Sequence, residues 1–288
     1  MDATQLSPDR RHVTTPLGEL AYIDVGDGPP ALFVHGVFLN GHLWHGVVDG
    51  VRDLRRCIAV DLPGHGASPL ADGQDLSFAG HADLLAAACD ALGLDTVDLV
   101  GNDTGGAVAQ VLAARHPDRL RTLTLTNCDV HSNLPPEAFK PTVELAEAGQ
   151  LADVLGPILA DPDSARGPAA LGGGFERPEA LTDDDLRAYV GPVLARPDAA
   201  RDIERFLVAL RAEELMGVEP DLAKLTVPTL VVWGTGDPFF ELSWAHWLRD
   251  TIPGVEAVVE VEGAKLFFPH ERPGDLVAPL RRFWQAHS

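Results

Sequence analysis

The chain has 288 residues, of which 45% are hydrophobic and 23% are charged, and its formal net charge is −21 at pH 7. These proportions are those of an ordinary globular protein, long enough for one large domain or two small ones. The negative field repels phosphate, which argues against nucleic acid or an anionic membrane surface as a partner and leaves a small-molecule substrate.

Cysteine use and the lack of a long apolar run favour an intracellular location. Cys57, Cys89 and Cys128 are odd in number and widely spaced, so they predict neither a disulfide framework nor a zinc site. No apolar run approaches the roughly 18 residues that a membrane helix needs. We therefore expect a cytoplasmic protein with reduced thiols and with no metal or other cofactor. The sequence does not specify the oligomeric state.

Short apolar runs separated by helical segments predict parallel strands joined by crossover helices. The runs are bounded by Gly, Pro or Asp, and several are too continuously apolar to be half exposed. Strands are expected at 18–25, 31–34, 57–61, 97–100, 120–126, 229–233 and 255–261, and helices at 80–92, 106–116, 242–251 and 273–286. This alternation predicts an α/β fold with a mostly parallel central sheet flanked by helices.

Between residues 131 and 224 the alternation gives way to helical periodicity without strands. Helices are expected there at 136–148, 182–195 and 199–216. Pro and Gly cluster at 161–174, which predicts a loop that helps to shape a ligand entrance. We therefore expect a helical cap at 131–224, inserted into a core domain formed by 1–130 and 225–288.

The segment 97–110 carries the most informative motif. It consists of an apolar strand, the turn GNDTG at 101–105, and a helix. Glycines on both sides of the central residue let the chain turn sharply and expose that side chain between strand and helix. Backbone N–H groups and the helix dipole favour negative charge at this point. Asp103 is therefore a candidate nucleophile, although an Asp before a helix is often only an N-cap.

Four further segments support a catalytic role for this turn: VHGVF at 34–38, DLPGHGAS at 61–68, WGTGDPF at 233–239 and ERP at 271–273. Together with the turn, they resemble the α/β-hydrolase fold superfamily over nearly the whole chain, and within it the haloalkane dehalogenases and epoxide hydrolases. The resemblance implies an oxyanion hole formed by the backbone N–H groups of Val37 and Thr104. It also places Asp237 at the position of the triad acid and makes His35 a packing residue.

A carboxylate nucleophile restricts the substrate. Unlike serine, it is ionised at neutral pH and needs no base to attack. Attack on an sp³ carbon, by opening an epoxide or displacing a halide, leaves an alkyl ester that water can cleave. Attack on an ester would leave an anhydride. Epoxides and alkyl halides are therefore the expected electrophiles.

The residue after the nucleophile favours an epoxide over an alkyl halide. Haloalkane dehalogenases place Trp there to bind the halide, whereas this chain has Thr104, and none of its five Trp residues falls in the expected cap. Epoxide hydrolases use cap tyrosines as acids, and Tyr189 is the only tyrosine in the expected cap. Tyr189 is therefore a candidate acid, with packing at the edge of a helix as the alternative.

The histidine that this family uses to activate water is missing. The C-terminal segment reads EGAKLFFPHERP at 262–273. Counting back from its last proline places the histidine position at Leu266, or at Lys265 if the loop slips by one residue. Neither side chain is an imidazole, so another group is needed to cleave the covalent ester.

Several groups are candidates for that role. Lys265 is a candidate partner of Asp237, and His270 follows about one helical turn later, where it is also explained as a residue of the last helix. His131 and Asp129 follow the strand at 120–126, whose carboxyl end faces the site in an α/β sheet. Polar residues in such a loop are also explained by turn formation alone.

The sequence leaves three functions open. The first is a hydrolase, most similar to an epoxide hydrolase, acting on a small hydrophobic or polycyclic substrate. The second is a non-hydrolytic isomerase, lyase or cyclase in which Asp103 is a general acid and base. The third is a ligand-binding protein on the same scaffold. An ionisable side chain in an intact glycine turn favours an enzyme, because a binding protein has no need of it.

Overall fold

The computed structural model describes residues 10–196 and 198–287. At its centre lies a sheet of eight strands in the order β1-β2-β4-β3-β5-β6-β7-β8. Strand β2 pairs antiparallel with β1 and β4, and the other neighbouring strands pair in parallel. The strands are β1 (Arg11–Thr15), β2 (Gly18–Val25), β3 (Pro30–Val34), β4 (Arg56–Val60), β5 (Val97–Asp103), β6 (Leu120–Cys128), β7 (Thr229–Gly234) and β8 (Val255–Val261). The predicted α/β class with a mostly parallel sheet is confirmed.

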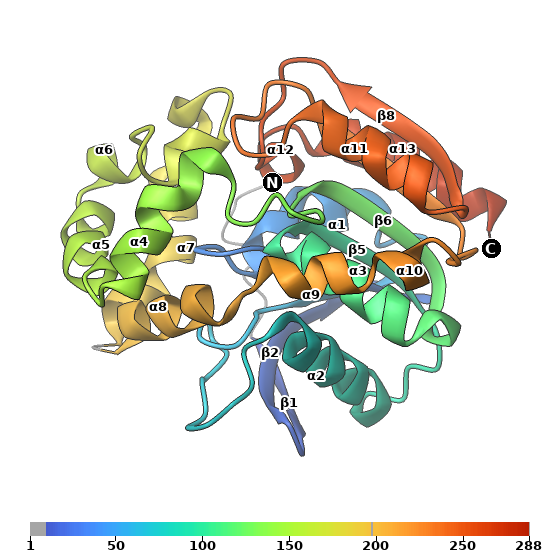
Figure 1. The fold of residues 1–288 in the computed structure, drawn as a ribbon, viewed down its shortest axis with the longest axis horizontal. Helices are drawn as coiled ribbons and strands as arrows, with labels where there is room; N and C mark the ends of the chain where they lie inside the picture. Colours follow the sequence, from blue (N-terminus) through green and yellow to red (C-terminus); the bar gives the residue numbers. More distant parts are fainter. Residues whose placement is uncertain (1–9, 197, 288) are drawn as a thin grey trace.

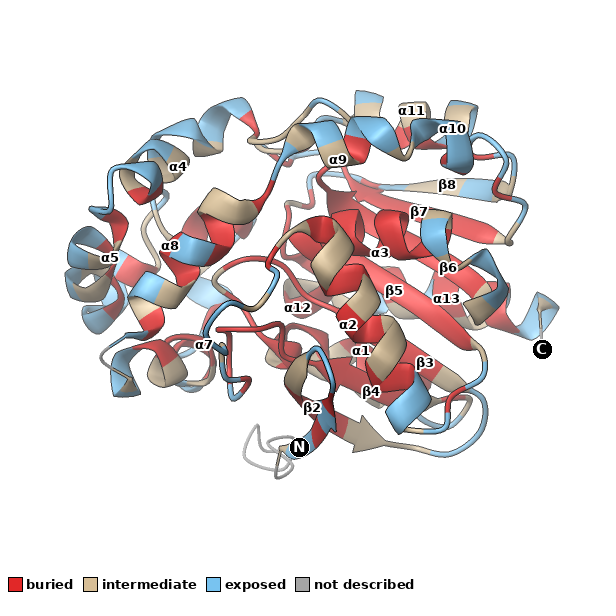
Figure 2. Cartoon of the chain, turned by 60° about the horizontal axis from the view of Figure 1, so that its bottom comes forward, coloured by how far each residue is buried: buried red, intermediate tan, exposed pale blue. Residues whose placement is uncertain are grey.

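Six helices flank the sheet: α1 (His45–Val51), α2 (Phe78–Ala91), α3 (Thr104–Arg115), α11 (Leu242–Thr251), α12 (Phe268–Glu271) and α13 (Pro273–Ala286). Helices α2 and α3 pack together on one face, and α1 and α13 pack together on the other (Figures 1 and 2). In the part of the chain that the structure describes, no helix combines the length and the apolar character needed to cross a bilayer.

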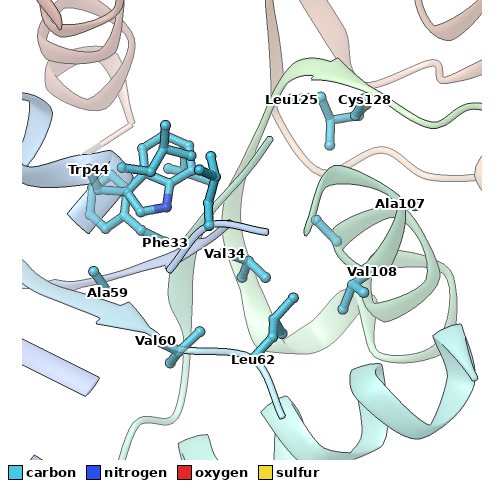
Figure 3. Packing of buried hydrophobic residues seen from close by; sticks show 14 of the residues in the cluster. Phe33, Val34, Trp44, Ala59, Val60, Leu62, Ala107, Val108, Leu125 and Cys128 are labelled. Atoms are coloured by element: carbon cyan, nitrogen blue, oxygen red, sulfur yellow. The ribbon is translucent and has the colours of Figure 1, made fainter. Parts of the chain in front are cut away.

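Strand β3 shows how the sheet is held from both sides. The ring of Phe33 lies 5.4 Å from that of Trp44 and 6.3 Å from that of Trp284, measured between centroids. Val34 points to the opposite face, toward Ala107 of α3 (Figure 3). Each large apolar side chain buried in this way contributes about 1.5–3 kcal/mol. The packing fixes the end of β3 beside β5, where the loop after β3 passes Asp103.

The chain between β6 and β7 is helical. Its helices are α4 (Lys140–Glu147), α5 (Leu151–Ala160), α6 (Pro162–Ala165), α7 (Asp183–Ala195), α8 (Ala199–Ala209), α9 (Ala212–Gly217) and α10 (Glu219–Leu222). Three short 3₁₀ helices, η4 (Glu137–Phe139), η5 (Leu171–Gly174) and η6 (Pro178–Ala180), lie in the same segment. Two others, η2 (Gly41–Trp44) and η3 (Pro117–Arg119), precede β6. Helices α4 to α8 form a lobe beside the sheet, at the left of Figure 1, whereas α9 and α10 contact α3 of the core. The expected cap range of 131–224 thus includes two helices that pack on the core.

Two expectations for this helical segment need correction. The expected helix at 199–216 is two helices, α8 and α9, because Leu210 between them has extended backbone with φ −76° and ψ 135°. The expected loop at 161–174 contains α6 and η5. Helix α5 is not predicted because its ten residues include Gly156 and Pro157, which disfavour helix in isolation.

Candidate active site

Asp103 ends β5 and immediately precedes α3. Its backbone has φ 57° and ψ −136°, a sparsely populated region for a residue with a side chain. The chain closes tightly around it: a Cβ atom added to Gly36 would lie 2.0 Å from Asp103 Oδ2, and one added to Gly105 would lie 2.3 Å from the carbonyl oxygen of Val34. Glycine is therefore required at both positions.

The backbone N–H groups of Thr104 and Val37 act on the Asp103 carboxylate and lower its pKa, against the larger opposite effect of burial. In the described structure its side chain makes no capping hydrogen bond to the next turn of α3, which argues against a role as an N-cap alone. Two converging N–H groups at the start of a helix stabilise negative charge on a carboxylate oxygen or on a tetrahedral intermediate. These are the two donors that the resemblance implies for an oxyanion hole.

A cavity of about 90 Å³ opens above Asp103 and is mostly apolar. Its ionisable side chains, among the described residues, are Asp103 and Asp129. The core contributes Val37, Asp103, Thr104, Asp129, Phe239, Phe240, Leu266 and Phe267, and the chain between β6 and β7 contributes Leu134, Pro135, Pro136, Phe139, Val143, Ala170, Gly174, Leu207 and Leu210. The cavity therefore lies between the sheet and the helical lobe.

Asp129 follows β6, and it is 2% exposed. The hydroxyl of Thr104 lies 3.4 Å from Asp129 Oδ2, toward which it donates, and in the sheet Asp103 pairs with Cys128, the residue before Asp129. Burial and the negative charge of Asp103 raise the pKa of Asp129 well above its usual range. Burial, with a smaller contribution from Asp237, raises the pKa of Asp103 to about 7. The pair thus consists of two buried carboxyl groups whose pKa values are both raised.

Asp237 lies behind the cavity wall. Its Oδ2 accepts a hydrogen bond of 2.7 Å from the side chain of Asn127, and its Oδ1 accepts one of 2.8 Å from the backbone of Phe239. Burial raises the pKa of Asp237 to about 7, and the charge of Lys265 acts in the opposite direction. The side-chain hydrogen-bond partner of this carboxyl is therefore Asn127, whereas the sequence suggested Lys265. Leu266, where the sequence count predicts the family's histidine position, lines the cavity.

The other candidates lie away from the cavity. The hydroxyl of Tyr189 is 2.8 Å from His270 Nδ1, so these two residues bind each other. His131 Nε2 lies 3.1 Å from a carboxylate oxygen of Glu219, and its ring is 5.1 Å from that of Trp247. None of Tyr189, His270 and His131 is among the described lining residues. The sequence positions of these three residues did not reveal the directions in which their side chains point.

His35 has the environment of a packing residue. Its Nε2 accepts a hydrogen bond of 2.8 Å from the backbone N–H of Leu62, and its Nδ1 lies 2.6 Å from the carbonyl oxygen of Gly36. Burial lowers the pKa of His35 to about 3, so the ring is neutral. Among the candidate bases from the sequence, Asp129 is the one that lines the cavity with Asp103.

Comparisons with known proteins agree with this geometry. The sequence model of a family described as alpha/beta hydrolase fold matches residues 29–271. Haloalkane dehalogenase 2 of Mycobacterium tuberculosis (strain ATCC 25618 / H37Rv) is 28% identical over 294 residues, which cover 96% of this chain and 95% of that protein. A haloalkane dehalogenase of Mesorhizobium japonicum is 38% identical over 115 residues, or 40% of this chain and 37% of that protein.

Solved structures show the same fold. The structure of the epoxide hydrolase CorEH without ligand superposes with a TM-score of 0.81 at 19% identity, covering 97% of this chain and 99% of that one. The resemblance to haloalkane dehalogenases that the motifs indicated is thus supported over 96% of the chain, and the epoxide hydrolase structure shares its fold. The family match, the sheet order and the strained turn at Asp103 agree with one another. The chain therefore belongs to the α/β-hydrolase fold family.

Proposed function

We propose that the protein hydrolyses epoxides of small hydrophobic molecules, with Asp103 as the nucleophile and Asp129 in place of the usual histidine. The observation that carries this proposal is the pair of carboxyl groups in one apolar cavity. The backbone N–H groups of Thr104 and Val37 favour the ionised form of Asp103, whereas the pKa of Asp129 is raised well above its usual range by burial and by Asp103. The cavity volume of about 90 Å³ favours a small substrate over a polycyclic one.

In the first step, an oxygen of ionised Asp103 attacks an epoxide carbon and displaces the epoxide oxygen from it. Asp129 donates its proton to that oxygen as the bond breaks, so no alkoxide is released into an apolar site. The product of this step is an alkyl ester on Asp103 with a hydroxyl on the neighbouring carbon. Asp129 is left ionised, and it takes the role that the sequence assigned to Tyr189.

In the second step, Asp129 removes a proton from water, and the hydroxide attacks the ester carbonyl carbon of Asp103. The N–H groups of Val37 and Thr104 stabilise the oxyanion that forms. Asp129 returns the proton to the departing alkoxide, which leaves as a diol. Asp103 is then protonated and Asp129 ionised, and proton transfer between the two carboxyls restores the starting pair.

A variant of Asp129 tests this assignment. The activity of the wild type is expected to rise as pH increases through about 7, where Asp103 ionises, and to fall at higher pH, where Asp129 loses its proton. Asp129→Asn should lower kcat by at least about 100-fold, because it removes the group that transfers protons.

The pH profile separates this role from a packing role. The residual activity of Asp129→Asn should keep the rise near pH 7 and lose the fall at high pH. The measurement is the pH dependence of kcat and kcat/KM with a series of small epoxides. A folded Asp129→Asn protein with wild-type kcat, or with both limbs of the profile intact, would rule out Asp129 as the proton-transfer group.

Haloalkane hydrolysis, the activity named for the dehalogenase relatives, lacks a halide donor in this site. Thr104 follows the nucleophile, and the described cavity lining includes no tryptophan. The indole N–H of Trp233 donates to the carbonyl oxygen of Phe240. We therefore expect negligible halide release from a panel of short bromoalkanes and chloroalkanes, measured as free halide. Robust release would show that another donor binds the leaving group.

One observation favours a second candidate function. A carboxyl with a pKa of about 7, raised mainly by burial, is also suited to general acid and base catalysis at neutral pH, as Asp103 would need in an isomerase, lyase or cyclase. That chemistry forms no covalent ester on Asp103. The two functions therefore differ in a directly measurable intermediate, the alkyl ester on Asp103.

A further inference from the structure

Four polar side chains from distant parts of the chain meet outside the cavity. They are His42 of η2, His45 of α1, Asp185 of α7 and His270 of α12, and we call them the histidine cluster. One ring nitrogen from each histidine lies within 4.8 Å of those of the other two. His42 Nε2 is 2.9 Å from Asp185 Oδ1, and His270 Nε2 is 3.6 Å from Asp185 Oδ2. The cluster therefore joins the helical lobe to the core.

Hydrogen bonds to Nδ1 orient two of the rings. His45 Nδ1 lies 3.0 Å from the carbonyl oxygen of His42, and His270 Nδ1 lies 2.8 Å from the hydroxyl of Tyr189. With Nδ1 engaged in both rings, Nε2 is the nitrogen that remains for a ligand. This is the arrangement in which proteins hold metal-binding histidines, since the second ring nitrogen bonds to a carbonyl, carboxylate or other polar group.

We propose that His42, His45, His270 and Asp185 bind one divalent transition-metal ion of the zinc class, which fastens α7 to the core. Imidazole and carboxylate are ligands that Zn²⁺ accepts in tetrahedral sites. Zinc–nitrogen bonds of about 2.0–2.1 Å place ligand atoms about 3.3 Å apart. From atoms no more than 4.8 Å apart, the three nitrogens reach that geometry by moving less than about 1 Å each toward a common centre.

The surroundings indicate a structural ion. Phe175 packs on His270 at 5.5 Å between ring centroids and on Phe267, which lines the cavity, at 5.4 Å. These two rings separate the histidine cluster from the substrate cavity. The three histidines form the preassembled group, and Asp185, which lies beside His42 and His270, would supply the fourth ligand of a closed tetrahedral shell, as in structural zinc sites. The ion is therefore expected to affect stability, independently of the reaction proposed for Asp103.

Access to the cluster comes from the side of His42 and His45, which are partly exposed, whereas His270 is buried. Nonspecific binding is the main competitor in a chain with a net charge of −21 and eleven histidines. His246 offers a matched control, because its Nε2 lies 3.6 Å from one carboxylate oxygen, that of Glu260, at the protein surface. A variant at His246 removes a surface imidazole and leaves the histidine cluster intact.

The experiment is a Zn²⁺ titration of the full chain after treatment with a chelator, followed by calorimetry and by thermal unfolding. The wild type should bind one equivalent, and its Tm should rise with free zinc. Co²⁺ should give the visible absorption bands of a tetrahedral site. His45→Gln and Asp185→Asn should each bind zinc at least about 100-fold more weakly, since even the loss of an outer hydrogen-bond partner costs 10–100-fold. His246→Gln should bind zinc as the wild type does.

Circular dichroism establishes that each variant is folded, and the Co²⁺ spectrum of the wild type tests the site without any substitution. Absence of a tight equivalent in the wild type would overturn the proposal, as would an octahedral Co²⁺ spectrum. Equal zinc affinity in His45→Gln, Asp185→Asn and the wild type would show that the bound metal lies elsewhere. A loss confined to His246→Gln would assign it to the surface pair.

Discussion

Replacement of Asp103 by Ala is expected to lower turnover by at least about 10⁴-fold while the protein remains folded, because the covalent step has no other nucleophile. The side chain ends at the cavity, so its removal leaves the packing of the sheet unchanged. The measurement is single-turnover kinetics with small epoxides, together with circular dichroism of the variant. Turnover near that of the wild type by a folded Asp103→Ala protein would contradict every enzymatic role proposed for this site.

The same position is expected to show a trade between activity and stability. Burial raises the pKa of Asp103 to about 7 in the folded protein from 3.8, so the ionised form destabilises the fold, increasingly as pH rises from about 4 to 7. Asp103→Asn has the same shape and cannot ionise. At pH 8 it should therefore increase the free energy of unfolding by on the order of 1–4 kcal/mol.

Urea unfolding at two pH values checks this sign. Near pH 4 the carboxyl of folded Asp103 is protonated, and the wild type and Asp103→Asn should have similar free energies of unfolding. Only the difference between the two pH values reports on the buried charge, because any loss of packing is common to both. If the stability of Asp103→Asn relative to the wild type does not increase from pH 4 to pH 8, the carboxylate is not destabilising in the folded state.

Introducing an imidazole at Leu266 is expected to speed cleavage of the covalent ester. Leu266 lines the cavity at the position of the family's histidine, and the buried carboxyl of Asp237 acts electrostatically on Asp103 from the same region. A positioned base contributes about 10²–10⁴-fold. Leu266→His should therefore raise the rate of ester hydrolysis above the rate that Asp129 supports, by up to that factor, and lower the amount of adduct that mass spectrometry detects at Asp103.

Leu266→Gln is the matched control, since it adds a polar side chain without a base of suitable pKa. It should leave the adduct as abundant as in the wild type. An unchanged rate in a folded Leu266→His protein would indicate either a wrongly counted position or a native base that already cleaves the ester efficiently. Asp129→Asn in the Leu266→His background separates the two when hydrolysis of the Asp103 ester itself is measured, because a misplaced imidazole cannot restore that step.

The sequence predicted most of the sheet because its strands are short, continuous apolar runs. Strand β1, with the sequence RHVTT, escapes this signal because Val13 is its single large apolar residue, and pairing with β2 defines it. Helix α8 ends before the predicted boundary because the chain turns at Leu210 to reach the core. Both differences arise from tertiary contacts, which local periodicity does not encode.

In the candidate site, too, the residues of a local motif could be predicted, and those placed by tertiary packing could not. The turn at Asp103 is a local motif, so its glycines and the strand before it were enough to single out the side chain. The side chains of Tyr189, His270 and His131 are directed by packing between distant segments. That packing pairs Tyr189 with His270 and turns His131 toward Glu219. The histidine cluster was not visible for the same reason, because the fold brings its members together.

Single turnover in heavy-oxygen water tests the central claim most directly, namely that Asp103 is a nucleophile. Water attacks the carbonyl carbon of the Asp103 ester, so one turnover should leave heavy oxygen in the Asp103 peptide and an unlabelled oxygen in the product. Quenched enzyme should also carry a covalent adduct at Asp103. Product formation with no label in the Asp103 peptide and no adduct would contradict the account and would assign Asp103 to acid and base catalysis.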